Sequence, residues 1–226
     1  ADTSEKLKEQ IVSDEVGMDA LIAAVRKAKR IAIVPTDGLD AVEICDGETV
    51  YRAQWSVAGG KYNELLSTVF SAEVKKLGHN IKDLMGLLMK DKLPVEGFTF
   101  DTALAAYLLD ANDGDYSLTR ISTKYLSHEL DGAQAIFELY SVLDAKLDEL
   151  GMTKLYYEVE LPLCRVLADM EASGFYVDRK ALYDFGESLN DGIARMQAGI
   201  WAHAGHEFYI NSPKQLGEVL FEELML

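Results

Sequence analysis

The sequence predicts an α/β fold in which helices flank a small sheet, followed by a region that contains helices alone. Three short apolar segments, 31–36, 41–45 and 49–52, lie close together, and Asp46-Gly47 between the last two is typical of a tight hairpin turn. A small apolar sheet must be covered by helices. Hydrophobic residues around these segments recur at helical spacing, and long helical patterns take over from Met152 onward.

The elements expected around the three strands follow in chain order. Residues 1–16 are charged and weakly periodic, which predicts a mobile lead-in. Residues 74–78 predict a further short strand. Phe100–Asp110 is apolar on nearly all sides, which is typical of a central buried helix. The other helices expected before residue 151 are 18–29, 62–70, one that carries Leu84, 117–126 and 133–150.

The helical region is predicted to contain helices 155–173, 179–204 and 213–226. Pro162 should bend the first of them. Asp178 is the expected N-cap of the second, and Ser212-Pro213 followed by Gln215 predicts a capping box on the third. This change in character places a domain boundary near residue 150, with domains 1–150 and 151–226. An initial Ala and a last helix without a terminal cap favour a piece of a longer protein.

The composition limits the classes of function. The formal net charge of −16 argues against a broad electrostatic hold on nucleic acid. No apolar run is long enough to span a bilayer and no signal peptide opens the chain, so we expect a cytoplasmic protein. Cys45 and Cys164 are isolated from each other. They predict buried thiols rather than a disulfide or a metal site.

Several spaced phrases of the helical region resemble a known family. They are Glu158-Val-Glu-Leu-Pro-Leu163, Val166-Leu-Ala-Asp-Met-Glu171, Gly174-Phe-Tyr-Val-Asp178 and the run from Phe208 to Phe221. In this order they resemble the opening of the polymerase domain of bacterial DNA polymerase I. The resemblance implies that residues 151–226 form the helical base of the polymerase thumb.

The first 150 residues resemble the 3′–5′ exonuclease-like domain that precedes this region in the family. The supporting phrases are Leu77-Gly-His-Asn-Ile-Lys82, the run from Phe100 to Leu109, and Gly132-Ala-Gln-Ala-Ile136. The resemblance implies a ribonuclease H-like mixed sheet flanked by helices. Exonucleases of this kind hydrolyse phosphodiesters with two divalent ions, which need carboxylate oxygens as ligands.

The positions at which the family carries its metal carboxylates hold other residues here. Alignment of the first strand places the pair on Val34 and Thr36, which suits the alternation of a strand but supplies no carboxylate. The third position falls on Leu84 and the fourth on Ala135, while Asp131 stands where the family has a tyrosine. We therefore expect no metal ligands, no catalytic residue and no cofactor in this chain.

Other acids leave an alternative open. Asp37, Asp40 and Asp83 lie near these positions, so an active metal-dependent exonuclease with displaced carboxylates is the second hypothesis. A non-catalytic interaction module on the same fold is the third. Tight Mg²⁺ or Mn²⁺ binding would favour the second, and a natural gene that ends near Leu226 would favour the third.

The polymerase resemblance also implies partners. In the family this region supports a thumb that grips primer–template DNA through backbone contacts, which position DNA without reading its sequence. Asn211, Ser212 and Lys214, at the start of the last helix, are the candidate phosphate contacts. The palm, where Mg²⁺ acts in the parent enzyme, has no counterpart here, so the chain alone cannot polymerise. The remainder of the polypeptide is expected to pack on residues 151–226, and no membrane partner is expected.

Overall fold

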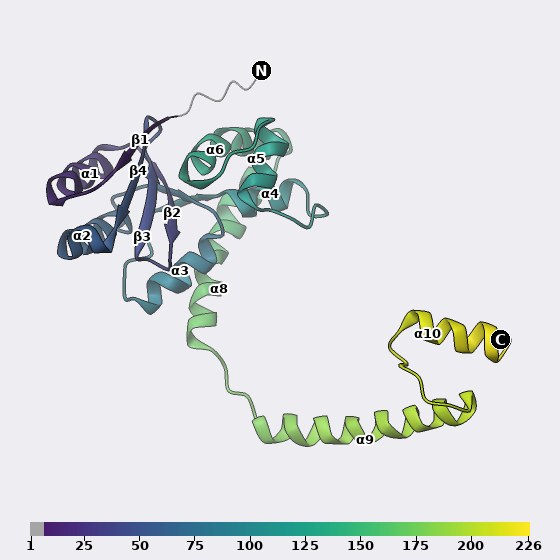
Figure 1. Ribbon diagram of the computed structural model, residues 1–226. Coiled ribbons are helices and arrows are strands. Elements are labelled where there is room, and N and C mark those ends of the chain that lie inside the picture. The colour runs from purple at the N-terminus through teal and green to yellow at the C-terminus, as the bar shows by residue number, and fades with distance from the viewer. Residues whose placement is uncertain (1–6) are drawn as a thin grey trace. The chain divides into compact units, whose positions relative to one another are not determined.

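The computed structural model describes residues 7–226, and its contacts divide the chain into two compact units after Gly174. Each unit is described by itself. Figure 1 shows a sheet with helices in the first unit and helices alone in the second. The predicted mixed sheet flanked by helices, with a helical region after it, is confirmed. No helix among the described residues is long and apolar enough to cross a membrane.

The sheet of the first unit has six strands in the order β1-β4-β3-β2-β5-β6. The two antiparallel pairs are β2 with β3 and β3 with β4, and the other neighbours are parallel. The hairpin turn is confirmed, because the Asp46 carboxylate accepts hydrogen bonds from the N–H groups of Glu48 and Thr49 at 2.9 and 2.8 Å. The strands are β1 (Lys8–Ile11), β2 (Ile31–Thr36), β3 (Ala41–Cys45), β4 (Thr49–Gln54), β5 (Lys76–Gly78) and β6 (Phe98–Asp101).

Helices cover both faces of the sheet, and each face has its own hydrophobic core (Figure 1). One core joins Ile31, Ile33 and Ile44 to α1 (Glu15–Lys27), α2 (Trp55–Val69) and α3 (Ile81–Lys90). The other joins alternate strand residues such as Ala32 and Cys45 to the three helices that follow β6. These are α4 (Thr102–Leu109), α5 (Leu118–Leu126) and α6 (Gly132–Glu149).

Four segments differ from the sequence prediction. The helix predicted over 62–70 is longer, since α2 begins at Trp55, and the strand predicted over 74–78 begins only at Lys76. Residues 8–11, predicted to be part of a mobile lead-in, form β1, because Lys8–Ile11 pairs in register with Thr49–Arg52 of β4. Residues 98–101 form β6 next to β5, so the helix predicted over Phe100–Asp110 begins only at Thr102. The Asp101 carboxylate ends the strand and caps the helix by accepting from the N–H groups of Ala103 and Leu104.

A π-helical stretch comes just before Pro162, where the sequence predicted a bend. α7 (Thr153–Leu155) continues into the π-helix η1 (Tyr156–Glu160) and then into α8 (Leu161–Ser173). Proline has no N–H to complete an α-helical ladder, and widening the preceding turn accommodates that loss. Cys164 and Ala168 of α8 are buried in the core that contains α3, so α8 packs within the first unit.

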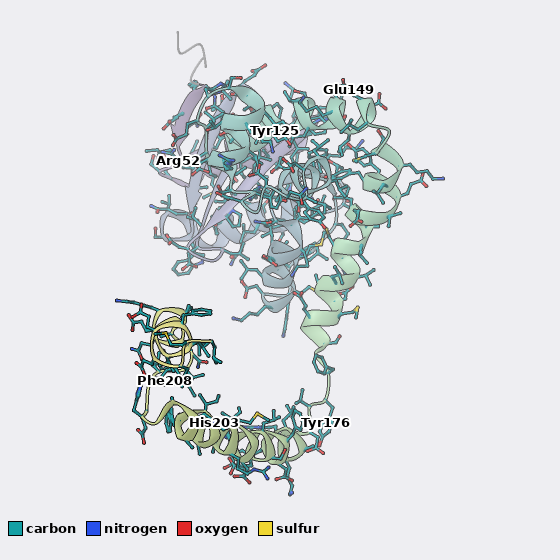
Figure 2. All side chains as sticks on the ribbon, turned by 90° about the vertical axis from the view of Figure 1, so that its right-hand side faces the viewer. Arg52, Tyr125, Glu149, Tyr176, His203 and Phe208 are labelled. Carbon is teal, nitrogen blue, oxygen red and sulfur yellow. The ribbon has the colours of Figure 1, made fainter. Side chains whose placement is uncertain are left out.

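The second unit contains α9 (Arg179–Ala204), α10 (Pro213–Gly217) and the π-helix η2 (Glu218–Glu223). Asp178 caps α9 as predicted, through a hydrogen bond from the N–H of Ala181 at 3.0 Å. Figure 2 labels Tyr176 in the extended stretch that leads into α9. The boundary near residue 150 refers to family domains and stays a prediction. The compact units instead divide after Gly174, because residues 153–173 pack on the sheet-containing core.

Candidate functional site

The first two family carboxylate positions lie on β2 and face the same side of the sheet. Val34 is paired across the hairpin with Glu43, and Thr36 with Ala41. Residues two apart on a strand share a face. Val34 is half-buried and packs against the core that contains α6, whereas Thr36 is exposed at the end of the strand. Neither side chain offers the carboxylate oxygen that a magnesium ion prefers.

The structure brings the first and third positions together. Val34 and the buried Leu84 of α3 line one cavity of about 300 Å³. Ala135 is fully buried in α6 within the neighbouring core, and Thr36 borders a different hollow at the end of the sheet. The cavity is lined by Ile33, Val34, Pro35, His79, Asn80, Asp83, Leu84, Leu87 and Leu118.

The Asp101 side chain is hydrogen-bonded to the start of α3, the helix that carries Leu84. Its carboxylate accepts hydrogen bonds from the N–H groups of Asn80 and Ile81, at 3.0 and 2.8 Å, and so fixes the start of α3. The same carboxylate caps α4, and only 3% of the residue is exposed. Burial raises the pKa of Asp101, while the backbone N–H donors oppose that rise. One buried side chain therefore positions the starts of two helices.

His79 stands at the polar end of the cavity. Its Nδ1 lies 2.9 Å from the hydroxyl oxygen of Thr102, and burial lowers the pKa of the imidazole below its usual value. A neutral ring follows at pH 7, because an ordinary histidine pKa already lies near 6.5. The site therefore supplies no positive charge from this residue.

Two acids near the cavity, Glu43 and Asp83, already have hydrogen-bond or ion-pair partners. The Glu43 carboxylate, across the hairpin from Val34, accepts from the N–H of Ala133 at 2.7 Å and from the Arg52 guanidinium at 3.0 Å. Figure 2 labels Arg52 on the first unit. Asp83 is exposed and ion-paired with Lys82 at 2.8 Å.

The remaining acids that the sequence offered are Asp131, whose carboxylate caps a helix, and Asp37 and Asp40, whose main chains form a turn. Asp131 caps α6 by accepting from the N–H of Gly132 at 2.8 Å. Asp37 has a left-handed backbone (φ 51°), and its carbonyl accepts from the N–H of Asp40, so the two close a turn after β2. Among residues 7–226, no group of three or more His, Cys, Asp or Glu side chains is arranged to hold a metal ion. The donor set around the cavity does not fit a two-metal nuclease centre.

The predicted DNA contacts lie in the second unit. Ser212 caps α10 as predicted, because its hydroxyl accepts from the N–H of Gln215 at 3.4 Å. The full capping box is wrong, since the Gln215 carboxamide oxygen accepts instead from the N–H of Tyr209 at 2.8 Å. Lys214 is exposed, with its ammonium 3.9 Å from Glu218, and Asn211 is exposed. A phosphate contact by these residues stays a prediction.

Sequence reasoning missed two residues that shape the site, Asp101 and Tyr156. The Tyr156 hydroxyl, on η1, accepts from the N–H of Asp101 at 2.6 Å and donates to the carbonyl oxygen of the same residue at 3.0 Å. A signal for Asp101 was present, because an acid before a helix-forming run is typical of an N-cap. Nothing local to Tyr156 indicates its partner, which lies 55 residues away in sequence.

A six-stranded mixed sheet with helices on both faces fits a ribonuclease H-like domain. The family model that matches residues 38–138 is described as the ribonuclease H-like domain of DNA polymerase I. The chain is 27% identical to DNA polymerase I of Borreliella burgdorferi, over 99% of the chain and 29% of that enzyme. It is 31% identical to DNA polymerase I of Mycobacterium leprae, over 81% of the chain and 23% of that enzyme.

A solved structure extends the relationship to both units. The polymerase domain of Pol1 from M. smegmatis, in complex with DNA primer-template and dNTP, matches 96% of this chain and 41% of that one. The TM-score is 0.79 and the sequences are 26% identical. The chain is a relative of bacterial DNA polymerase I that covers the ribonuclease H-like domain and the start of the polymerase domain. It spans less than a third of the length of the two polymerases named above.

Proposed function

We propose that this chain is the part of a DNA polymerase I that contains a non-catalytic exonuclease-like domain and the base of the thumb. The observation that carries the proposal is the cavity at the family's metal positions. Val34 and Leu84 line it with apolar side chains, and Glu43 nearby is bound to Arg52 and Ala133. A divalent ion there would lose its hydration and find only the single carboxylate of Asp83, which is ion-paired with Lys82.

The domain that lost its chemistry keeps a structural role in this proposal. Helices 153–173 rest on it through the buried Tyr156, whose hydroxyl bonds both backbone groups of Asp101. On the surface, Lys82 of α3 pairs with Glu171 of α8 at 2.8 Å. In this proposal the exonuclease-like core therefore supports the first helices of the polymerase domain, which pack against it.

The rest of the polymerase packs on the helical region. α9 carries a stripe of exposed apolar residues at helical spacing, and a stripe of this kind is normally covered. We assign its cover to the remainder of the same polypeptide, which includes a palm that uses Mg²⁺. The stripe consists of Leu182, Phe185, Leu189, Ile193, Met196 and Ile200.

The parent enzyme then acts on primer–template DNA in template-directed synthesis. Asn211, Ser212 and Lys214 are the proposed phosphate contacts, because a helix start with a nearby ammonium suits an anion. We place the enzyme in the cytoplasm. A reducing compartment fits the free, buried thiols of Cys45 and Cys164.

Mn²⁺ binding tests the loss of the nuclease centre. We expect electron paramagnetic resonance titration of the chain to show only weak binding that 150 mM salt suppresses, since the acids are dispersed over the surface. Asp83→Asn is the matched variant at the cavity, and Asp184→Asn on α9 is its control. Saturable binding of one or two ions that Asp83→Asn removes and Asp184→Asn keeps would overturn the proposal.

A further inference from the structure

The cavity beside Val34 has the properties of a ligand pocket in its own right. Its volume is about 300 Å³, and its walls come from β2, α3 and the start of α5. Ile33, Leu84 and Leu118 are each less than a tenth exposed, so this part of the wall belongs to the packed core, while Asp83 lies at the exposed rim. Side chains fixed in this way hold a preformed shape, which is typical of sites for small molecules.

The polar groups of the cavity are few and lie together. His79, Asn80 and Asp83 contribute to the lining, from the end of β5 and the start of α3. Asn80 has a left-handed backbone (φ 54°) that is held by the hydrogen bond from its N–H to Asp101. An apolar wall with the Asp83 carboxylate and the Asn80 carboxamide oxygen at one end offers acceptors to a flat ring that carries one N–H donor.

Charge restricts the ligand further. Asp83 brings a carboxylate to the cavity, and its neighbour Lys82 is held between Asp83 and Glu171 at 2.8 Å from each. His79 is neutral at pH 7 because burial lowers its pKa. The chain as a whole carries a formal charge of −16. An anionic ligand would meet repulsion here without a free cation to offset it.

We infer that this cavity binds a small, neutral, flat apolar ring with one N–H donor. The ring fills the space between Val34, Leu84 and Leu87, and its N–H donates to the acceptor end formed by Asn80 and Asp83. Burial of the ring supplies the binding free energy, and the hydrogen bond sets its orientation. The inference needs no metal and no phosphate, and it stands independently of the proposed role in the polymerase.

The test is a titration of the isotope-labelled 226-residue chain with indole, followed through its amide resonances by nuclear magnetic resonance. We expect saturable shifts confined to residues around the cavity, including Val34, Leu84 and Leu87. The nucleotide dAMP, added with Mg²⁺, should cause no such shifts. Binding of dAMP with Mg²⁺ in place of indole would overturn this inference and the proposed loss of the nuclease site together. Absence of saturable shifts with indole, without dAMP binding, would overturn this inference alone.

Filling the cavity should abolish binding. Val34→Phe places a ring in the space that the ligand needs, and we expect its affinity for indole to fall at least tenfold. Val16→Phe is the matched control, because Val16 is 78% exposed on α1. Leu87→Phe fills the cavity from a half-buried position. This second variant replaces Val34→Phe in the test if Val34→Phe does not fold. Unchanged affinity in a folded cavity variant would contradict the inference.

Discussion

The two units differ in what their longest helices bury. α6 of the first unit places Ala135, Ile136, Leu139 and Leu143 in a closed core, and each of them is fully buried. α9 of the second unit is longer, yet none of its residues is buried in the part of the chain that the structure describes. The first unit is therefore stabilised by its own contacts, whereas α9 of the second unit leaves its apolar side chains exposed.

This contrast suits the proposal that the first unit is kept for its structural support rather than for nuclease chemistry. If Val34, Leu84 and Ala135 stand where the family carries carboxylates, as we predict, the apolar side chains spare a partly dry region the cost of unpaired charges. Selection on the supporting role is enough to keep the fold in our account, since the helices of 153–173 depend on it.

Hydrogen exchange on the intact chain should give the largest difference between the units. Amides in α6 open only with the whole core, while amides in α9 are protected by the helix alone. We expect exchange in the middle of α9 to be faster by roughly a thousandfold or more. Mass spectrometry of peptides from 135–147 and 185–198 measures it. Equal protection of the amides in the two helices would contradict the stated difference between the two units.

Removal of the double cap should give the next largest effect. Asp101→Ala leaves the N–H groups of two buried helix starts without their acceptor, and we expect a loss of about 3 kcal/mol in the free energy of unfolding. Urea denaturation followed by circular dichroism measures it. Asp178→Ala removes the exposed cap of α9 and serves as control, with a change below about 0.5 kcal/mol in the same transition. Equal losses in the two variants would contradict the account.

A buried lysine should give a smaller, pH-dependent effect. Lys76 is fully buried, and its ammonium donates to the carbonyl oxygens of Ser71, Val74 and Glu96 at 3.0, 2.8 and 2.6 Å. Burial lowers its pKa from 10.5 to about 7. Between these values the unfolded chain binds more protons than the folded one. The stability that this group contributes therefore rises as pH increases from 7 toward 10.

Lys76→Met should remove that rise. The slope contributed by one group is at most about 1.4 kcal/mol per pH unit, and urea midpoints between pH 7.5 and 9 report it. Lys154→Met is the control, because this side chain is 83% exposed. A slope that is the same in wild type and Lys76→Met would show that the buried ammonium stays charged throughout the window.

The sequence predicted the parts of the fold that local chemistry determines. The hairpin strands follow from apolar runs around Asp46-Gly47, and α9 was predicted with its observed bounds between the cap Asp178 and Gly205. β1 could not be predicted, because its charged residues become a strand only by pairing with residues about forty positions later. β6 could not be predicted either, because its residues form a strand only by pairing with β5.

In the candidate site, too, the sequence indicated some features, whereas others appear only in the structure. Family resemblance located Val34 and Leu84, and the structure shows that they share one cavity. The engagement of Glu43 by α6 depends on a contact between residues 90 positions apart, which no local pattern signals. The tie between Tyr156 and Asp101 is equally non-local. Sequence reasoning thus proposed the positions, which stay a prediction, but could not foresee the contacts around them.

Digestion of a single-stranded oligonucleotide labelled at its 5′ end tests the central claim most directly. The purified chain, shown to be folded by circular dichroism, is incubated with the substrate and Mg²⁺, and then with Mn²⁺. We predict that the oligonucleotide stays intact, because no metal-binding carboxylates converge at the cavity. A ladder of products that EDTA abolishes and that persists through repeated purification would contradict the account, and would assign metal binding to acids such as Asp37, Asp40 or Asp83.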